Sequence, residues 1–343
     1  MSPTYAAAVL IGRFQPFHDG HAALLHAALA QAERAVVVLG SAFRARNARN
    51  PFTWQERAEM IAASLTPEEA RRVLFVPIRD YYDDARWSKA VDLGVRAALA
   101  QAGVDAARPA LIGYRKDEST YYLALFPQWS FIASEKQGDI DATAVRRLYF
   151  SGDATAWATL KTLVPEAIAT FLERWKTLPA YAAMREEHAA IDAYKKEWGS
   201  GPFVTLDAVV TAAAHVLLVR RGRTPGKGTW AVPGGFLEGR ERLLQGAIRE
   251  LKEETGIAVP DADLIAALRE VAVFDHPDRS QRGRIITHAH WFDLPPQTLP
   301  AVAGDDDAAE AKWFPIAALA GMEEEMFEDH FAILNRFLGM GWS

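Results

Sequence analysis

The sequence contains no cysteine, no long apolar run and no excess of basic residues. Without cysteine the chain can form neither disulfides nor thiolate metal sites, and it has no cysteine nucleophile. No run of eighteen apolar residues occurs, which excludes a membrane-spanning helix. The net charge of −6 argues against a protein that coats nucleic acid or membrane surfaces, because both attract basic chains. We therefore expect small-molecule partners, with no nucleic acid and no membrane among them.

Two kinds of signal are missing as well. The first residues, Met1–Tyr5, lack the basic and apolar regions of a secretory signal, which together with the missing cysteines predicts a cytoplasmic protein. Neither a Walker A pattern nor GxGxxG is present. The P-loop and Rossmann fingerprints therefore do not apply.

Length and composition predict two folded domains. The chain has 343 residues, of which 50% are hydrophobic and 24% are charged. A Gly/Pro cluster at Trp198–Pro202 is the expected boundary, so we predict a domain at residues 1–180, a linker at 181–202 and a domain at 203–343. Residues 1–180 carry 21 basic and 19 acidic side chains, whereas the rest of the chain carries 17 and 25. The sequence leaves open whether the protein is a homo-oligomer.

The first half alternates short apolar runs with helical patterns. The runs are nearly continuous, as in parallel strands that are covered on both faces. Strand–helix alternation of this kind predicts a doubly wound α/β domain with a parallel sheet. The expected strands are Ala7–Ile11, Ala35–Leu39, Val73–Ile78, Ala110–Ile112 and Trp129–Ala133, and the expected helices include His21–Ala32, Glu56–Ser64 and Lys89–Gln101.

The second half shows longer strand patterns around one strong helix, Arg242–Thr255. A closing helix is expected at Glu323–Leu338. The expected strands are Phe203–Ala214, His215–Arg220, Leu264–Phe274 and Thr287–Leu294.

Three glutamates gather on the strong helix. Glu250, Glu253 and Glu254 are three and four residues apart, so their side chains leave the helix on one face. Close carboxylates repel one another unless a cation lies among them. Oxygen ligands suit Mg²⁺, with Mn²⁺ as an alternative, and both ions bridge phosphate oxygens and activate water. The competing interpretation is the solvated acidic face of a surface helix.

The same glutamates belong to a longer pattern that begins at Gly235, continues with Glu241 and ends in the run Arg249–Ile257. This pattern resembles the Nudix box, and the resemblance to Nudix hydrolases covers about residues 203–338. It implies an α/β/α domain that hydrolyses a nucleoside diphosphate linked to another moiety. It also implies that the three glutamates bind the metal and are catalytic. We interpret Arg249 and Glu241 as an ion pair that orients the loop.

The loop Phe274–Arg284 resembles the corresponding loop of ADP-ribose-type Nudix enzymes and of Nudix-like regulators of NAD metabolism. Its arginines, Arg279, Arg282 and Arg284, would clamp a phosphate or ribose of the substrate. The alternative is an exposed basic loop. Asp305–Asp307 is interpreted as a solvated turn rather than a metal site.

Two histidines follow the first expected strand, directly before a helix. His18 and His21 could donate hydrogen bonds to phosphate oxygens there, where the helix amides also attract anions. A zinc site is disfavoured, because the next histidine, His26, has only apolar neighbours and alanine. The pair resembles the HxGH signature of nucleotidylyltransferases, which implies an ATP site. Its expected residues are Gly12, Arg13, Phe14, His18 and His21.

A second motif follows the last expected strand of the first half. Ile140–Arg146 resembles the ISxTxxR motif of the same family. The resemblance implies that Thr143 caps a helix and that Arg146 is catalytic and reaches the ATP phosphates. Asp141 stands where the family usually has serine, which puts one polar contact in doubt.

Further stretches resemble one subgroup, the nicotinamide-nucleotide adenylyltransferases that are fused to a Nudix domain, over about residues 6–176. Trp87 offers a flat face to the cationic pyridinium ring of the mononucleotide. Asp80 would accept from the nicotinamide amide or the ribose hydroxyls. Alternatively, Trp87 is a core aromatic residue. The stretches are Gly12–His18, Ala48–Trp54, Pro77–Tyr82 and Lys116–Tyr122.

Together the resemblances imply a bifunctional enzyme of NAD metabolism. Its first domain would transfer the adenylyl group of ATP, with Mg²⁺, to nicotinamide mononucleotide, which gives NAD and pyrophosphate. Its second domain would hydrolyse ADP-ribose to AMP and ribose 5-phosphate. Two alternatives remain, namely another HxGH nucleotidylyltransferase with a different Nudix substrate, and a Nudix-like regulator that binds ADP-ribose. The preference between the amide and the acid mononucleotide stays open.

Overall fold

The computed structural model describes residues 4–104, 109–114, 124–134, 140–295 and 299–340. The chain divides into two compact units, Met1–Arg185 and Glu186–Ser343. The division falls inside helix α8 (Pro179–Trp198), within the segment that the sequence assigned to a linker. In the described ranges no helix is both long and apolar enough to cross a bilayer.

The sheet of the first unit is parallel and follows the expected strands. Its order is β3-β2-β1-β4-β5. The strand order reverses at β1, and open α/β sheets bind ligands at such a switch point, outside the carboxyl ends of the strands. The predicted doubly wound parallel sheet is confirmed. The strands are β1 (Tyr5–Gly12), β2 (Ala32–Leu39), β3 (Val73–Pro77), β4 (Ala110–Gly113) and β5 (Ser130–Ala133).

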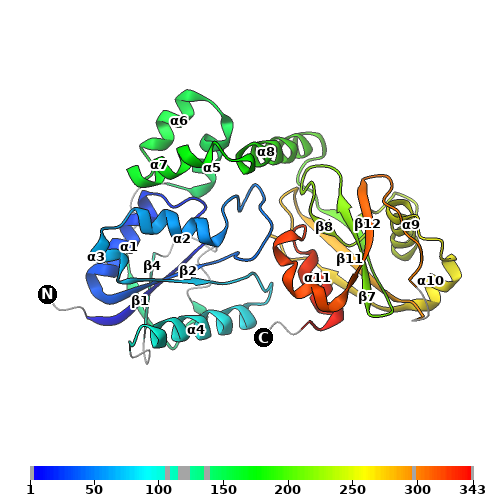
Figure 1. Ribbon diagram of the computed structural model, residues 1–343, viewed down its shortest axis with the longest axis horizontal. Coiled ribbons are helices and arrows are strands. Elements are labelled where there is room, and N and C mark those ends of the chain that lie inside the picture. The colour runs from blue at the N-terminus through cyan, green and yellow to red at the C-terminus, as the bar shows by residue number, and fades with distance from the viewer. Residues whose placement is uncertain (1–3, 105–108, 115–123, 135–139, 296–298, 341–343) are drawn as a thin grey trace. The chain divides into compact units, whose positions relative to one another are not determined.

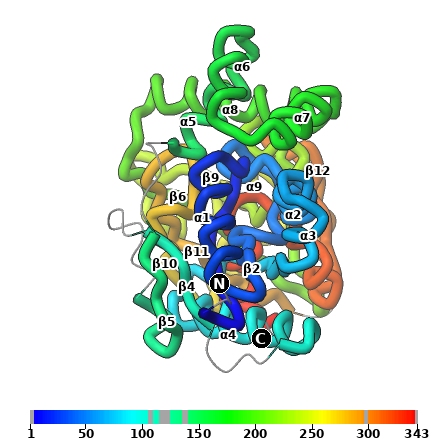
Figure 2. Tube along the Cα trace, turned by 90° about the vertical axis from the view of Figure 1, so that its left-hand side faces the viewer, coloured from blue at the N-terminus to red at the C-terminus, as the bar shows by residue number. Residues whose placement is uncertain are grey.

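Helices cover both faces of this sheet. Figure 1 shows α1 and α2 on one face and α4 on the other, and in Figure 2 the group α5–α7 again lies on the side away from α4. The side chains of β1 alternate accordingly, because Leu10 packs into the core with α1 and Val9 into the core with α4. The helices are α1 (Asp19–Gln31), α2 (Trp54–Ala63), α3 (Pro67–Ala70), α4 (Asp84–Gln101), α5 (Ala142–Ser151), α6 (Ala154–Lys161) and α7 (Glu166–Trp175).

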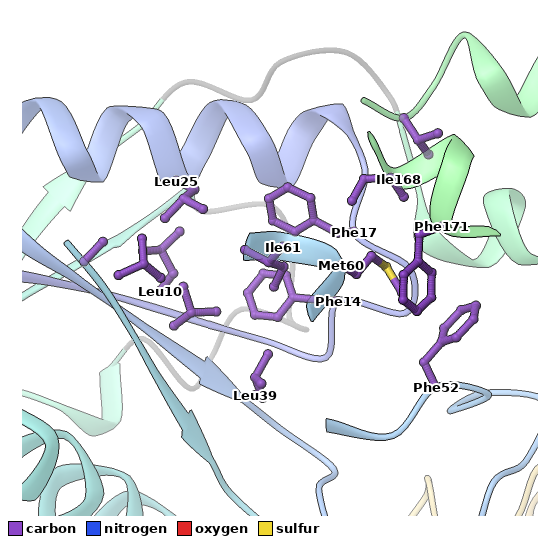
Figure 3. Close-up of a cluster of buried hydrophobic side chains, with 14 of the residues drawn as sticks. Leu10, Phe14, Phe17, Leu25, Leu39, Phe52, Met60, Ile61, Ile168 and Phe171 are labelled. Carbon is purple, nitrogen blue, oxygen red and sulfur yellow. The ribbon is translucent and has the colours of Figure 1, made fainter. Parts of the chain in front are cut away.

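The core on the α1 side extends to the loop that follows β1. Phe14 and Phe17 of this loop lie among Leu10, Leu25 and Ile61 (Figure 3). Both phenyl rings are almost fully buried. Burial of a phenylalanine side chain is worth about 1.5–3 kcal/mol, so the two rings hold the loop firmly on the core. The packing thereby fixes the backbone that carries His18.

The sheet of the second unit is mixed. Its order is β10-β11-β6-β7-β12, with β8 paired to β7 and β9 to β6. Strands β6 and β11 are parallel, and the other pairs are antiparallel. Helices α9 and α10 lie on one face and α11 on the other (Figure 1), each over its own apolar core, which confirms the α/β/α expectation. The elements are β6 (Phe203–Ala212), β7 (His215–Arg221), β8 (Trp230–Ala231), β9 (Gly234–Phe236), α9 (Leu243–Thr255), α10 (Asp261–Ala267), β10 (Leu268–Phe274), β11 (Ile285–Asp293), β12 (Ala308–Pro315) and α11 (His330–Leu338).

Two predicted elements of the second unit are wrong in part. The expected strand Leu264–Phe274 is a strand only from Leu268, because Pro260 and the acidic first turn after it start helix α10. The expected closing helix Glu323–Leu338 becomes α-helical only at His330. Before that point, the amide of Phe327 donates to the carbonyl of Trp230 at 2.8 Å, and this pairing pulls the chain out of the helix. Strand β12 was not predicted.

The second half of α8 packs within the second unit. Ile191 is buried, and the Tyr194 ring lies against the rings of Phe203 and Phe236 at 5.9 and 6.4 Å. We therefore expect a fragment of residues 186–343 to be more stable than one of residues 203–343, by roughly 3 kcal/mol from the apolar side chains that the shorter fragment exposes. Urea unfolding of the two fragments measures this difference. Equal stabilities would place the boundary at residue 203 instead.

Candidate active sites

The histidine pair lies where strand β1 passes into helix α1. Gly12 ends β1, and its carbonyl accepts from the amide of Gly40 at 2.9 Å, which joins the ends of β1 and β2. His18 is the N-cap residue of α1, and its ring stacks on His21 with the centroids 3.7 Å apart. The edge of Phe14 meets the ring of His21 at 4.8 Å. The phenyl ring therefore supports the pair from the core side.

Burial keeps both imidazoles neutral. It lowers the pKa of His18 to about 4, although Asp141 partly offsets the effect. Burial also lowers the pKa of His21 well below its usual value, and the nearby His18 adds to this shift. The Nδ1 atoms of both rings have no hydrogen-bond partner within the described part of the chain. Each ring thus keeps one buried nitrogen without a hydrogen-bond partner inside the described chain.

The alternative zinc site is not supported. His26 is exposed, and its Nε2 lies 3.8 Å from Glu69. Among the described residues no group of three His, Cys, Asp or Glu side chains is placed to hold a metal ion. No third His, Cys, Asp or Glu of the described residues completes a metal site with His18 and His21.

Helix α5 brings Arg146 to the same loop. Its Nη1 donates to the carbonyl of Gln15 at 2.8 Å, and its Nη2 donates to Thr143 Oγ1 at 3.2 Å. Burial, assisted by the neighbouring Arg13 and Arg49, lowers the pKa of Arg146 to about 10, which leaves it charged at neutral pH. The buried guanidinium therefore adds positive charge to the loop that carries the two histidines.

One detail of this motif differs from the prediction. Thr143 does not cap α5, because Asp141 is the N-cap residue and its carboxylate accepts from the Thr143 amide at 2.9 Å. An aspartate caps a helix as well as the serine of the family motif does. The hydroxyl of Thr143 is consequently available to Arg146.

Asp80 and Trp87 lie at separate positions after strand β3. Asp80 accepts from Ser41 Oγ at 3.0 Å and from Arg44 Nη1 at 2.6 Å. Trp87 lies in α4, half-buried, with its ring 5.8 Å from that of Phe126 at the margin of the core. Asp80 is therefore part of a polar group at the carboxyl end of the sheet. The quoted stretch Lys116–Tyr122 lies outside the described residues.

Arg57 is a residue that the sequence analysis missed. This fully buried arginine donates to the carbonyl of Arg13 at 2.6 Å and to that of Gly40 at 2.7 Å. It therefore ties the loops after β1 and β2 together. Its sequence neighbourhood is an ordinary amphipathic helix and gave no signal of this role.

The depressed pKa of His18 predicts a pH effect on stability. The unfolded chain protonates His18 below about pH 6.5, whereas the folded chain does so only near pH 4, so stability falls as the pH drops between these values. The loss should reach about 2 kcal/mol at pH 5. His18→Asn removes this titration, so urea unfolding at pH 7 and pH 5 should show a smaller acid loss in the variant. An unchanged loss would contradict the burial of a neutral His18.

In the second unit, helix α9 presents its glutamates to strand β9. The carboxylate of Glu254 accepts from the Gly234 amide at 2.9 Å. Glu250 lies so close to Gly235 that a Cβ atom at this glycine would overlap the carboxylate. The glycines of the motif therefore let the strand approach the acidic face of the helix.

Arg249 holds three of the neighbouring carboxylates. It donates to Glu241 at 2.8 and 3.1 Å, as the sequence predicted, and the same guanidinium donates to Glu250 at 2.9 Å and Glu253 at 2.8 Å. Glu253 is the most exposed of the three, with 48% of its side chain accessible. The carboxylates thus meet around a charged group of the chain itself.

The three glutamates do not converge into a metal-binding group in this structure, as no three His, Cys, Asp or Glu side chains of the described residues do, but their oxygens are the ligand type that a divalent cation prefers. Burial raises the pKa of Glu254 to about 8, and the nearby Glu250 and Asp207 raise it further, while the Gly234 amide and Arg221 lower it. Burial is also the main reason why the pKa of Glu250 is raised. Such crowding of carboxylate oxygens is relieved by a hard cation, and oxygen is the ligand that Mg²⁺ and Mn²⁺ prefer.

A small pocket opens beside Glu254. Of the three predicted arginines, Arg279 and Arg282 line it and Arg284 does not. Arg284 instead donates to the carbonyl of Asp275. Six other charged or aromatic residues of the lining were not predicted from the sequence. They are Asp207, Arg221, Phe236, Phe327, Glu328 and His330.

The two lining arginines are held differently. Arg279 forms a buried bidentate pair with Asp329, with N–O distances of 2.8 and 2.9 Å. Arg282 lies 3.6 Å from Glu328 and between two phenyl rings, 5.7 Å from the centroid of Phe236 and 5.6 Å from that of Phe327. Its Nε has no hydrogen-bond partner among the described residues. Neither arginine therefore belongs to an exposed basic loop.

Asp207 places a carboxylate within the apolar strand β6. It is almost fully buried and accepts from Thr287 Oγ1 at 2.6 Å. Burial raises its pKa to about 6, although the nearby Arg279 opposes the effect. The sequence signal that could have indicated Asp207 is its position as a single aspartate within an apolar strand pattern.

Comparisons with known proteins cover both units. The cytidylyltransferase-like family model matches residues 9–147, and the NUDIX domain model matches residues 201–337. A nicotinamide/nicotinic acid mononucleotide adenylyltransferase of Acinetobacter baylyi is 36% identical over 54% of this chain and 94% of its own length. An ADP-ribose pyrophosphatase of Methanocaldococcus jannaschii is 33% identical over 39% of this chain and 76% of its own length.

One solved structure matches nearly the whole chain. It is a bifunctional NMN adenylyltransferase/ADP ribose pyrophosphatase from Francisella tularensis, complexed with AMP and a manganese ion. The two chains are 32% identical, the match covers 98% of this chain and 99% of the other, and the TM-score is 0.89. This chain therefore belongs to the family of bifunctional NMN adenylyltransferases that carry a Nudix ADP-ribose pyrophosphatase domain.

Proposed function

We propose that the first unit joins ATP and nicotinamide mononucleotide into NAD. A phosphate oxygen of the mononucleotide attacks the α-phosphorus of ATP, and the bond from this phosphorus to the oxygen that bridges to the β-phosphate breaks, which releases pyrophosphate. The observation that carries the proposal is the stacked pair His18 and His21 at the start of α1, on the same loop that Arg146 binds.

The residues of this unit would act by position and charge. His18, His21 and Arg146 donate to phosphate oxygens that gain charge during transfer. No covalent intermediate is needed, because the attacking group is already a phosphate. Gly12, Arg13, Phe14 and Thr143 shape and support the ATP site, and Asp80 and Trp87 are the proposed contacts to the mononucleotide.

The second unit hydrolyses ADP-ribose. A water oxygen attacks one phosphorus, the P–O–P bridge breaks, and AMP and ribose 5-phosphate leave. Glu250, Glu253 and Glu254 would hold the divalent cation, for which we propose Mg²⁺, with Mn²⁺ as a substitute. A cation bound there neutralises phosphate charge and activates water. Arg282 and Arg279 line the adjoining pocket, where positive charge favours a diphosphate.

Product analysis tests both activities in one protein. ATP and Mg²⁺ are incubated with nicotinamide mononucleotide or with its acid counterpart, and ADP-ribose is incubated separately with Mg²⁺ or Mn²⁺. NAD plus pyrophosphate, and AMP plus ribose 5-phosphate, are the expected products. Transfer only to flavin, pantetheine or cytidylyl substrates would favour another nucleotidylyltransferase. Binding of ADP-ribose without hydrolysis would favour a regulator.

A further inference from the structure

An acidic residue interrupts the buried face of helix α8. Met184, Glu187 and Ile191 are all buried, and their spacing of three and four residues places them on one face. The Glu187 side chain belongs to the second unit and is as deeply buried as its apolar neighbours. A buried carboxylate requires a compensating partner, because its desolvation is costly.

The partner of Glu187 is a backbone amide. The Gly226 N–H donates to Oε2 of Glu187 at 2.9 Å. Burial raises the pKa of this carboxyl and the charge of Glu328 raises it further, whereas the Gly226 amide and Arg221 lower it. Arg221 and Glu328 both line the Nudix pocket. Glu187 therefore lies near the pocket wall without lining the pocket.

Gly226 belongs to the loop between β7 and β8, and this loop contacts the wall directly. The carbonyl of the preceding Pro225 accepts from Arg221 Nε at 2.9 Å, and the Arg221 guanidinium lies 4.1 Å from the ring centroid of Phe327. A Cβ atom at Gly226 would overlap that ring. The loop thus orients the guanidinium of Arg221 and packs against Phe327.

We propose that Glu187 is a positioning residue for the hydrolysis of ADP-ribose. It holds the β7–β8 loop in the position in which the loop orients Arg221 and packs against Phe327. The proposal rests on the proposed hydrolase function of the second unit. A charge-assisted bond to an amide is stronger than a neutral one and has a fixed direction. An apolar residue at this position would fill the space but would leave the Gly226 amide without its acceptor.

Steady-state kinetics of the full chain tests the proposal. Glu187→Ala should raise KM for ADP-ribose about tenfold, the equivalent of one lost hydrogen bond to a charged group, with little change in kcat. If Arg221 and Phe327 contact the substrate away from the reacting phosphorus, as the proposal requires, their displacement weakens the ground state and the transition state alike. Glu187→Gln keeps an oxygen acceptor and should restore most of the affinity. Glu186→Ala, which removes an exposed neighbouring charge, is the matched control.

Several results would overturn the proposal. Glu187→Ala with the KM of the original protein, or Glu186→Ala with an equal rise, would show that the bond to Gly226 does not position the pocket. If adenylyl transfer by Glu187→Ala falls in parallel with hydrolysis, that variant is generally unfolded. The Glu187→Gln variant then decides, and a KM that is not restored in it contradicts the proposal. If the unsubstituted protein leaves ADP-ribose intact, the proposed function itself is wrong.

Discussion

His18→Ala should lower the rate of NAD synthesis by about 10²–10³ while the protein stays folded, since one preorganised donor to a transferring phosphate is worth that much. The ring that is lost stacks on His21 at the start of helix α1, on the loop that Arg146 binds. Release of pyrophosphate from ATP and nicotinamide mononucleotide measures the rate. His26→Ala provides the matched control, because His26 lies on the same helix but is exposed.

ADP-ribose hydrolysis by the His18→Ala protein should equal that of the original protein. This second activity reports on the integrity of the chain. A folded His18→Ala protein that makes NAD at the original rate would refute the assignment of the first site. Loss of both activities would point to misfolding rather than to a missing donor.

Glu254→Gln should reduce hydrolysis of ADP-ribose by more than about 100-fold, because loss of even an outer partner of a metal site costs 10- to 100-fold. The amide has nearly the same volume and can still accept from the Gly234 amide, so helix α9 should remain in place. The exposed Glu324 provides a control, since Glu324→Gln makes the same change in a side chain that does not line the pocket. NAD synthesis should be unaffected in both variants. Undiminished hydrolysis by Glu254→Gln would contradict the metal site.

The same variant should be more stable than the original protein when metal is removed. The pKa of Glu254 is about 8 in the folded chain and near 4.5 when unfolded, so the folded state loses stability as the pH rises between these values. At pH 7 the penalty is about 3 kcal/mol, and glutamine removes it. Urea unfolding in EDTA should show a larger difference between the two proteins at pH 8 than at pH 6.

The elements that sequence patterns predicted well are those whose burial is uniform. Strands β1, β2 and β4 lie inside the sheet, are largely buried and therefore appear as plain apolar runs. The segment before His330 was assigned to a helix because its composition suits one. The pairing of Phe327 with Trp230 overrides that preference, since it depends on a residue about a hundred positions away.

The residues of the candidate sites also form two classes, those that a local sequence pattern predicts and those that it does not. His18, Arg146 and the glutamates of α9 were found because their chemistry lies at fixed spacing in one short stretch. Asp207 and Arg221 come from neighbouring strands and meet only in the folded sheet, so no local pattern contains them. Thr143 was placed in the right motif, but Asp141 caps the helix, and its carboxylate accepts from the amide of Thr143 itself.

The position of Arg249 has a consequence for how the second site handles its cation. Its guanidinium touches Glu241, Glu250 and Glu253 and thus acts as an internal counter-ion for the acidic face. In the metal-free protein, Arg249 therefore already neutralises part of the negative charge of these glutamates. This lowers the electrostatic cost of the metal-free state, so we expect the second unit to stay folded when the metal is removed.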